Sequence, residues 1–521
     1  MELKIFIDQE IGFISRYGII QVMESIGLSY KLYDLKNINK INSREPYIIY
    51  SSKKNNNLIK KLNYSFIFFS FERNEIHLKD NIKRIKNLNY IKSFFIKTKV
   101  SSGFKKIFVS MDLPSIVGLF LTGEIENNYK SSLLREPFIN SINKLIESLI
   151  VEIYSSYNLP LITKYFWPNS YNGAFVLTHD IDYVDFPLPY LFSLIKKSLI
   201  QRKNPKKWLM AVLTNFKRRL IIKNKGLFNT FNNLKKYIEL EKKFNAKSSF
   251  YFLCDKSAYR LDCFTKQMKK LQKEGWEICL HSNPKKSNLN FIKKEKKKLE
   301  HLLGMEVYSV RQHRLNANFP EIWDLYNQAG FSHDSSFAYS EIIGSRAGFF
   351  LPYCAANPKE KKILNIIELP LNIMDTTLFH TKYMNLDSKK AFNHSKALID
   401  KILKYNGTCV LLWHNQTLDE ADKQTFTYVY KSLLEYAHKK NIWLVNSKKI
   451  SEWWKTRSRI KLIFRKEKNE IIIHITSPLI IKGFTMKVSL FIDGKINDNL
   501  IEYDLIKGRN QIRLKYQLFL K

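Results

Sequence analysis

The feature that most constrains this chain is an apolar run that ends in a polar cluster, Phe175–Asp182 (F-V-L-T-H-D-I-D). A short apolar run without polar alternation is typical of a strand that is covered on both faces of a sheet. Carboxylates at the carboxyl end of such a strand lie where barrel and α/β enzymes place their chemistry. Taken alone, the motif fits a strand end with an Asx-rich turn equally well.

Later segments repeat this pattern. Trp276–Leu280 runs into His281, and Val307–Val310 runs into Arg311-Gln312-His313. Ala246–Leu253, Ile366–Leu371 and Thr408–Trp413 are further strand candidates. Helical patterns separate most of these strands, which predicts βα units with a parallel sheet. We therefore expect one set of strand-end residues to carry any chemistry: His179, Asp180, Asp182, His281, Arg311, His313, Asp334 and His414.

The length of 521 residues is too great for one ordinary core and predicts two or three domains. Residues 1–130 resemble a small α/β domain, with a helix over Phe13–Ile26 that Gly27 can cap. Residues 131–169 are expected to be a helical linker, and 170–455 to contain the βα units. From 457 to 521 the apolar pattern has period two, which predicts a sandwich-like β appendage.

The formal charge of +39 is extreme. It would suit a nucleic-acid or membrane partner. Lysine is nevertheless spread over the whole chain, no nucleic-acid module accompanies it, and we expect no nucleic-acid partner. The densest stretch is 196–225, with eleven Lys or Arg and no acid. This basic insert fits either a solvated helix face or a contact with an anionic glycan, lipid carrier or membrane surface.

The five cysteines are odd in number and contain no C-x-x-C pair. This pattern argues for a reducing compartment rather than a disulfide framework. The first residues lack the basic and apolar regions of a signal peptide. No run of about 18 apolar residues predicts a membrane span. We expect a cytoplasmic protein, with the inner face of the membrane as a further location.

Two aspartates and several histidines at strand ends suit one divalent metal ion, with a free carboxylate left as a base. Zn²⁺ accepts His nitrogen and Asp oxygen ligands, and it is the metal that we favour. A single His near a strand end is more often structural than a ligand. Several such residues in one set of βα units favour the metal.

At this point the sequence shows a family resemblance. Residues from about 170 to 455 resemble the polysaccharide deacetylase family, which is carbohydrate esterase family 4 with its NodB-homology domain. The wording of the motifs resembles a bacterial subgroup with an extra N-terminal domain. Five motifs occur in the family's order: Thr178–Asp182, His281–Lys285, Arg311–His313, the segment G-F-S-H-D-S-S that contains Asp334, and Leu412–Asn415.

The resemblance implies a distorted (β/α) barrel and a metal-dependent hydrolase that acts on carbon–nitrogen bonds other than peptide bonds. It implies that Asp180 is the base that activates water and that Arg311 keeps it ionised. Asp182 and His281 would be metal ligands. His414 would be the acid that protonates the leaving amine.

Three further residues take roles by the same resemblance. Asp334 would orient His414, because a carboxylate fixes a histidine tautomer. Trp413 could form the floor of a sugar site, and Asn415 beside it could bind substrate.

One departure from the family concerns its third metal ligand. The family's second motif has a second histidine, and Lys285 stands there in this chain. His313 is the favoured replacement, because it follows Arg311 by two positions and shares its side of an extended strand end. His179 is the second candidate. It ranks lower because side chains alternate along a strand, so His179 is expected to face away from Asp180 and Asp182.

The leading hypothesis is removal of an N-acetyl group from an amino sugar of a glycan or a lipid-linked precursor, during assembly of a surface polysaccharide. The alternative is a catalytically inactive deacetylase-like domain that binds a glycan or a partner, and Lys285 is its best support.

Overall fold

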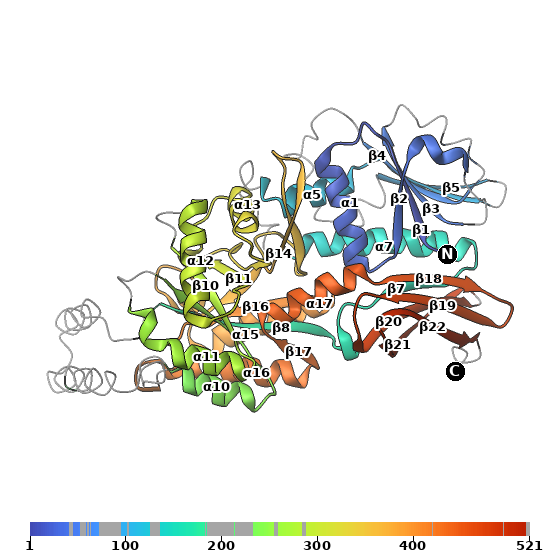
Figure 1. Ribbon diagram of the computed structural model, residues 1–521. Helices are drawn as coiled ribbons and strands as arrows, with labels where there is room; N and C mark the ends of the chain where they lie inside the picture. Colours follow the sequence, from blue (N-terminus) through green and yellow to red (C-terminus); the bar gives the residue numbers. More distant parts are fainter. Residues whose placement is uncertain are drawn as a thin grey trace. The chain divides into compact units, whose positions relative to one another are not determined.

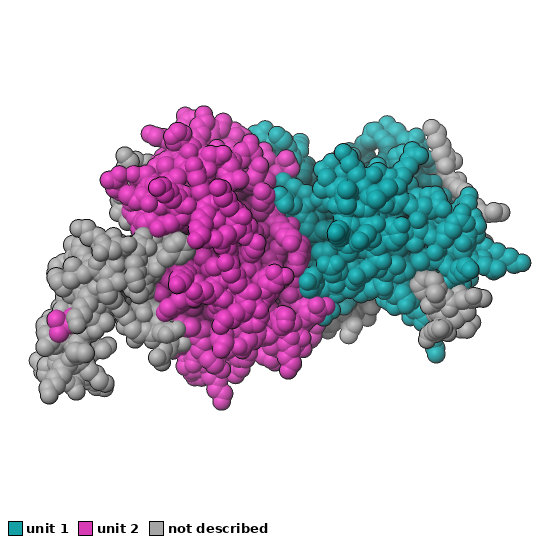
Figure 2. Space-filling model, turned by 60° about the horizontal axis from the view of Figure 1, so that its bottom comes forward, with its two compact units in different colours: residues 1–172, 347–364, 452–521 teal, residues 173–346, 365–451 magenta. Residues whose placement is uncertain are grey.

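The computed structural model describes most of the chain, and its residues group into two compact units (Figure 2). One unit comprises 1–172, 347–364 and 452–521, and the other 173–346 and 365–451. The basic insert lies outside the described residues except for Leu213, as does Lys285. The described residues are 1–40, 45–52, 59, 62, 64–71, 95–101, 104–124, 136–182, 184, 213, 233–254, 259–283, 288–418, 420–492 and 494–516.

The second unit is built on a curled half-barrel sheet in a mixed α/β arrangement (Figure 1). The strand order is β14-β12-β11-β10-β9-β8-β16-β15, and β17 also pairs with β8. The ladders from β14 to β15 and that of β17 are parallel. The expected α/β class is thereby confirmed. The strands are β8 (Gly173–Ile181), β9 (Ser249–Leu253), β10 (Glu277–Ser282), β11 (Ser309–Gln312), β12 (His333–Asp334), β14 (Lys362–Glu368), β15 (Leu371–Met374), β16 (Thr408–Leu412) and β17 (Ile442–Val445).

Strand β8 is buried along its whole length, as its unbroken apolar run predicts. It pairs with β16 and β17 through its first half and with β9 through its second half. Because side chains alternate along a strand, Thr178 and Asp180 point to one face of the sheet and His179 to the other. The alternation also brings Asp182, just beyond the strand, to the face of Asp180.

The expected strand Ile366–Leu371 is wrong in its bounds. Strand β14 ends at Glu368, Pro370 interrupts the run, and β15 begins at Leu371. Proline has no N–H to donate to a ladder, so the run could not continue as one central strand.

Helices follow most strands of this unit, and their local signals are clear. In α12 the Asn288 side chain accepts from the Phe291 amide at 2.9 Å, and Gly304 ends the helix with a φ of 73°. The helices are α10 (Leu234–Lys242), α11 (Thr265–Lys273), α12 (Leu289–Leu303), α13 (Glu321–Gln328), α14 (Asp375–Phe379), α15 (Ser388–Leu403) and α16 (Glu420–Lys439), with 3₁₀ turns η6 (Leu261–Phe264) and η8 (His313–Leu315).

The first unit contains a doubly wound sheet in the order β2-β1-β3-β4-β6-β5, in which only the β5–β6 ladder is antiparallel. Gly27 ends α1 in the left-handed region at a φ of 84°, as expected. The elements are β1 (Leu3–Ile7), α1 (Phe13–Ile26), β2 (Tyr30–Asp34), η1 (Leu35–Lys40), β3 (Tyr47–Ser52), β4 (Phe66–Phe71), β5 (Ile96–Ser101), β6 (Phe104–Val109), α5 (Leu113–Leu121) and α7 (Phe138–Ser156), together with β13 (Tyr353–Asn357).

Two three-stranded antiparallel sheets belong to the same unit, in the orders β18-β19-β22 and β21-β20-β7. This grouping differs from the four expected segments, because 131–172 and 452–521 join the N-terminal residues in one unit. The elements are β7 (Leu161–Lys164), η4 (Pro168–Ser170), β18 (Lys461–Lys466), β19 (Glu470–Ser477), β20 (Ile481–Ile492), β21 (Lys495–Leu505) and β22 (Gly508–Lys515). Helix α17 (Ser447–Arg459) has residues in both units. None of the described helices is long and apolar enough to cross a membrane.

Candidate functional site

A cavity of about 330 Å³ lies at the carboxyl ends of β8, β10, β11, β15 and β16. Both predicted aspartates of β8 line it, together with three of the predicted histidines. The lining residues are Asp180, Asp182, His281, His313, Arg314, Leu315, Ser340, Met374, Thr376, Tyr383, Leu412, His414 and Gln416.

Arg311 and Asp180 form a buried ion pair at the base of this cavity. The guanidinium Nη1 donates to Asp180 Oδ1 at 2.9 Å and to Thr178 Oγ1 at 2.9 Å. Its Nε and Nη2 donate to the carbonyl and hydroxyl of Ser335, and its Cζ lies 4.4 Å from the ring centre of Tyr251. Burial alone would lower the pKa of Arg311, but the Asp180 charge raises it. The guanidinium therefore stays charged and holds Asp180 in one orientation.

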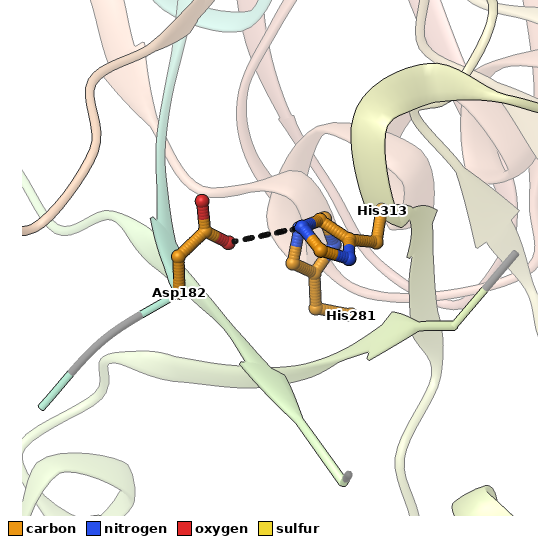
Figure 3. Close-up of side chains that lie close together, drawn as sticks. All are labelled: Asp182, His281 and His313. Carbon is orange, nitrogen blue, oxygen red and sulfur yellow. Dashed lines mark ion pairs between the residues drawn. The ribbon is translucent and has the colours of Figure 1, made fainter. Parts of the chain in front are cut away.

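Three side chains beside this pair could hold a metal ion: Asp182, His281 and His313. Their ligand atoms all lie within 4.8 Å of one another, and Figure 3 shows the Asp182 carboxylate facing the two imidazoles. Asp182 Oδ1 lies 3.4 Å from His281 Nε2 and 3.9 Å from His313 Nε2. It is buried and accepts no hydrogen bond from the described residues.

The tautomer of His281 fits a metal ligand. Its Nδ1 lies 3.1 Å from the Arg311 carbonyl oxygen, which can only accept, so Nδ1 carries the proton. In the neutral ring Nε2 then presents a lone pair, 3.4 Å from an oxygen of Asp180 and 3.4 Å from an oxygen of Asp182. Such a meeting of acceptors needs a positive charge between them, either a metal ion or a second proton on the His281 ring.

The spacing also agrees with a tetrahedral metal ion. Two ligand atoms at about 2.0–2.2 Å from Zn²⁺, at a tetrahedral angle, lie roughly 3.3–3.6 Å apart. The 3.4 Å distance between Asp182 Oδ1 and His281 Nε2 falls in this range. The 3.9 Å distance between Asp182 Oδ1 and His313 Nε2 is slightly longer. The donor set of two imidazoles and one carboxylate is one that catalytic zinc sites use.

The electrostatics of Asp182 and His313 agree with this interpretation, whereas those of His281 favour its charged ring: burial alone would lower its pKa, but Asp180 and Asp182 raise it. Burial alone would raise the pKa of Asp182, but the imidazoles of His281, His414 and His313 lower it far below its usual value. Burial and the neighbouring His281 lower the pKa of His313 to about 4, so its ring is neutral at pH 7. A metal ion needs an ionised carboxylate and a neutral imidazole.

His414 also lines the cavity, and it is held by Asp375. His414 Nδ1 is 2.6 Å from Asp375 Oδ1, and the His414 amide donates to Asp375 Oδ2 at 2.8 Å. Its Nε2 lies 3.7 Å from Asp182 Oδ2. Burial alone would lower the pKa of His414, but Asp375 and then Asp182 raise it to about 9. At neutral pH the ring therefore carries a proton that it can donate.

Asp375 is the site residue that the sequence reasoning missed. It directly follows the buried strand β15, so it carries the same signal as Asp180 or His414, an apolar run that ends in a polar residue. The expected strand Ile366–Leu371 stops at the first residue of β15, so the true strand end at Met374 and the aspartate that follows it were not recognised.

The prediction that Asp334 orients His414 is wrong. In the β11–β12 ladder Asp334 is the partner of Val310, so it shares the face of Val310 and not that of Arg311. It lies buried on the opposite face, accepts from Ser336 Oγ at 2.5 Å and interacts with the Glu368 carboxyl. It does not line the cavity.

The expected substrate contacts of Trp413 and Asn415 are also wrong in this geometry. Trp413 is fully buried and packs on Tyr430 and Phe379, with ring centres 5.5 and 6.2 Å away. Asn415 is fully buried as well, and its backbone N–H donates to the backbone carbonyl of Asp180. The backbone amides of both residues donate to carbonyls of β8, and neither side chain lines the cavity.

His179 points away from the metal site, as its alternation predicts. Its Nδ1 lies 2.8 Å from the Trp413 carbonyl oxygen, and its Nε2 lies 2.8 Å from Glu241 Oε1. Its ring packs on Tyr237, with the two ring centres 4.0 Å apart. It is a fully buried structural residue.

The buried carboxyl pair of Asp334 and Glu368 predicts a pH effect on stability. Burial raises the pKa of Asp334 to about 6, above the value of about 3.9 in an unfolded chain. The folded chain therefore holds a proton that the unfolded chain loses. The resulting stability is complete below about pH 4 and is lost as the pH rises through about 6.

Asp334→Asn cannot titrate at this position. We expect its melting temperature to decline less between pH 4 and 6 than that of the wild type, as measured by differential scanning calorimetry. Asp324→Asn, in the neighbouring helix α13, is the control and should decline like the wild type. Equal declines for all three proteins would contradict the raised pKa.

Comparisons with known proteins give similarity in structure alone. No protein-family model and no curated protein matches this chain. A solved structure from Mycobacterium smegmatis, described as a polysaccharide deacetylase, is 14% identical, with a TM-score of 0.40 over 58% of this chain and 98% of its own. The carbohydrate deacetylase Agd3 is 7% identical, with a TM-score of 0.43 over 99% of this chain and 98% of its own. A CE4 family pseudoenzyme from Bacillus anthracis is 9% identical, with a TM-score of 0.29 over 54% of this chain and 66% of its own.

These structural neighbours are carbohydrate deacetylases and one pseudoenzyme of that type.

Proposed function

We propose that this protein is a metal-dependent hydrolase that removes an N-acetyl group from an amino sugar of a glycan or glycan precursor. The observation that carries the proposal is one cavity with three kinds of group: the Asp182–His281–His313 set, the Asp180–Arg311 pair and the His414–Asp375 pair. Metal-assisted hydrolysis needs a cation site, a base and an acid within reach of one bond.

When bound, a divalent cation supplies Lewis-acid chemistry, which polarises an amide carbonyl and makes water more acidic. Asp182, His281 and His313 would hold it, and we favour Zn²⁺ on the donor set. Asp180 accepts the proton of the attacking water at its carboxylate, which Arg311 holds in one orientation through the 2.9 Å hydrogen bond to Oδ1.

His414 performs the second proton transfer. Its Nδ1 is held by Asp375, which leaves Nε2 free to face the cavity and donate to the departing nitrogen. The raised pKa of His414 keeps that proton in place at neutral pH until the amide nitrogen becomes basic. The products are acetate and a free amine on the sugar. The odd cysteine count supports a cytoplasmic place for the reaction.

The alternative function is a glycan-binding module without catalysis. Lys285, at the position of a family ligand, favours it. His313 argues against it, because it offers a third ligand from another strand end.

One experiment separates the two functions. Full-length protein is purified, its metal content is measured by plasma mass spectrometry, and acetate release is followed from N-acetylglucosamine oligosaccharides with and without added Zn²⁺. The hydrolase predicts about one metal ion per chain and zinc-dependent acetate release. A protein that binds the glycan but contains no metal and releases no acetate would instead be the glycan-binding module.

The corrected role of Asp375 gives a prediction of its own. Asp375→Asn removes the charge that holds the His414 proton, and we expect kcat for acetate release to fall about 10²-fold. Asp334→Asn should keep kcat within about threefold of the wild type, because Asp334 lies on the other face of the sheet. The opposite ranking would restore Asp334 as the partner of His414. Melting curves of both variants check that each is folded.

A further inference from the structure

An arginine that has no hydrogen bond or ion pair with the described residues lines the candidate site. Arg314 directly follows His313 in η8, and its exposed side chain lines the cavity. Within the described part of the chain, its guanidinium makes no hydrogen bond and no ion pair. This separates it from Arg311 three residues earlier, which is completely buried and donates hydrogen bonds from all three of its guanidinium nitrogens.

The backbone at this position is unfavourable for the residues that occupy it. Arg314 has a φ of 61° and Leu315 a φ of 54°, both in the left-handed region that glycine and asparagine adopt most easily. Both side chains line the cavity. Strained backbone of this kind concentrates at functional sites, where it fixes the direction of a side chain.

The charges of the cavity also leave Arg314 unbalanced. Asp180 is neutralised by Arg311 at 2.9 Å, and His414 lies against Asp375 at 2.6 Å. Asp182 is the remaining carboxylate among the lining residues, and a divalent cation there exceeds its charge by one. If Asp182 holds a divalent cation, the charge of Arg314 adds to a net positive charge in the cavity. A neutral sugar would not balance that charge.

We propose that Arg314 binds an anionic group of the substrate, a carboxylate or phosphate close to the sugar whose acetamido group enters the site. The assignment of the acetamido group rests on the proposed function, whereas the anion site rests on Arg314 itself. A guanidinium suits either anion, because its planar donors bind two oxygens at once.

The test uses matched pairs of probes that differ in one charged group. Hyaluronan tetrasaccharide is compared with its carboxyl methyl ester, and N-acetylglucosamine 1-phosphate with methyl N-acetylglucosaminide. Binding to the full, Zn²⁺-loaded chain is measured by isothermal titration calorimetry. One pair tests a uronate and the other a sugar phosphate, so the two sources of the anion are distinguished.

The variants are Arg314→Gln, Arg314→Lys and, as control, Lys297→Gln on the exposed face of α12. Glutamine is unbranched at Cβ, as arginine is, so it adds no backbone strain. We expect the wild type to bind one anionic probe at least about tenfold more tightly than its neutral partner, as a charged hydrogen bond would give. Arg314→Gln should reduce that preference to less than about twofold, Arg314→Lys should keep part of it, and Lys297→Gln should keep all of it.

The proposal is overturned if the wild type binds neither anionic probe, shows no preference in either pair, or keeps its preference in Arg314→Gln. Its failure is distinct from failure of the hydrolase. Acetate release with no anionic preference would refute the anion site alone. An Arg314-dependent preference with no acetate released from any probe would refute the hydrolase alone.

Discussion

Asp180→Asn is expected to reduce acetate release by about 10²–10⁴-fold while the protein keeps its metal. The amide of asparagine can still accept from Arg311, but it cannot take a proton from water. The metal set of Asp182, His281 and His313 does not include Asp180. Activity is measured as acetate released under saturating Zn²⁺, and metal content by plasma mass spectrometry after dialysis.

The matched variant is Asp182→Asn, two positions further along the chain and on the same face. We expect it to lose metal as well as activity, because Asp182 Oδ1 is the buried oxygen that faces both imidazoles. Asp180→Asn leaves the buried charge of Arg311 without its partner, so melting curves must show that the variant is folded at the assay temperature. Equal metal loss in the two variants would show that Asp180 is itself a ligand, since its Oδ2 lies 3.4 Å from His281 Nε2.

The sequence was sufficient for residues whose position depends on alternation along one strand. The unbroken apolar run of β8 placed Asp180 and Asp182 together, and period two placed His179 on the other face. The same rule selected His313 from Arg311, and the structure places Arg311 beside Asp180 and His313 beside Asp182.

The sequence failed where position depends on pairing between strands. Asp334 and Arg311 both end apolar runs, but the register Val310↔Asp334 puts them on opposite faces, and no local pattern encodes a register. Asp375 was missed because the expected strand Ile366–Leu371 ends where β15 begins, so the residue after β15 was not seen as a strand end. The pairing of β7 with β20, more than 300 residues apart in the chain, likewise has no local signal.

His313→Ala is expected to lower Zn²⁺ affinity at least about 10²-fold, by as much as His281→Ala does. The two imidazoles would supply two of the three protein ligands of the proposed metal site, and even a residue outside a ligand set can change metal affinity about 10–100-fold. Affinity is measured by competition with a chromogenic zinc chelator at pH 7.5, where the His313 ring is neutral because burial and His281 lower its pKa to about 4. His394→Ala, an exposed histidine of α15, is the control and should bind zinc like the wild type.

His179→Ala separates a ligand from a structural histidine. Its ring lies against Trp413 and Glu241 on the other face of β8, so its removal leaves a buried carboxylate without that partner. We expect a lower melting temperature with unchanged zinc affinity in the folded protein, whereas His313→Ala should lose zinc affinity with a smaller change in the metal-free melting temperature. Normal zinc binding by His313→Ala would remove it from the ligand set. If the wild type itself bound no divalent metal at millimolar concentration, the cavity would have its base and acid but no Lewis acid, and glycan binding without hydrolysis would be the function that its residues support.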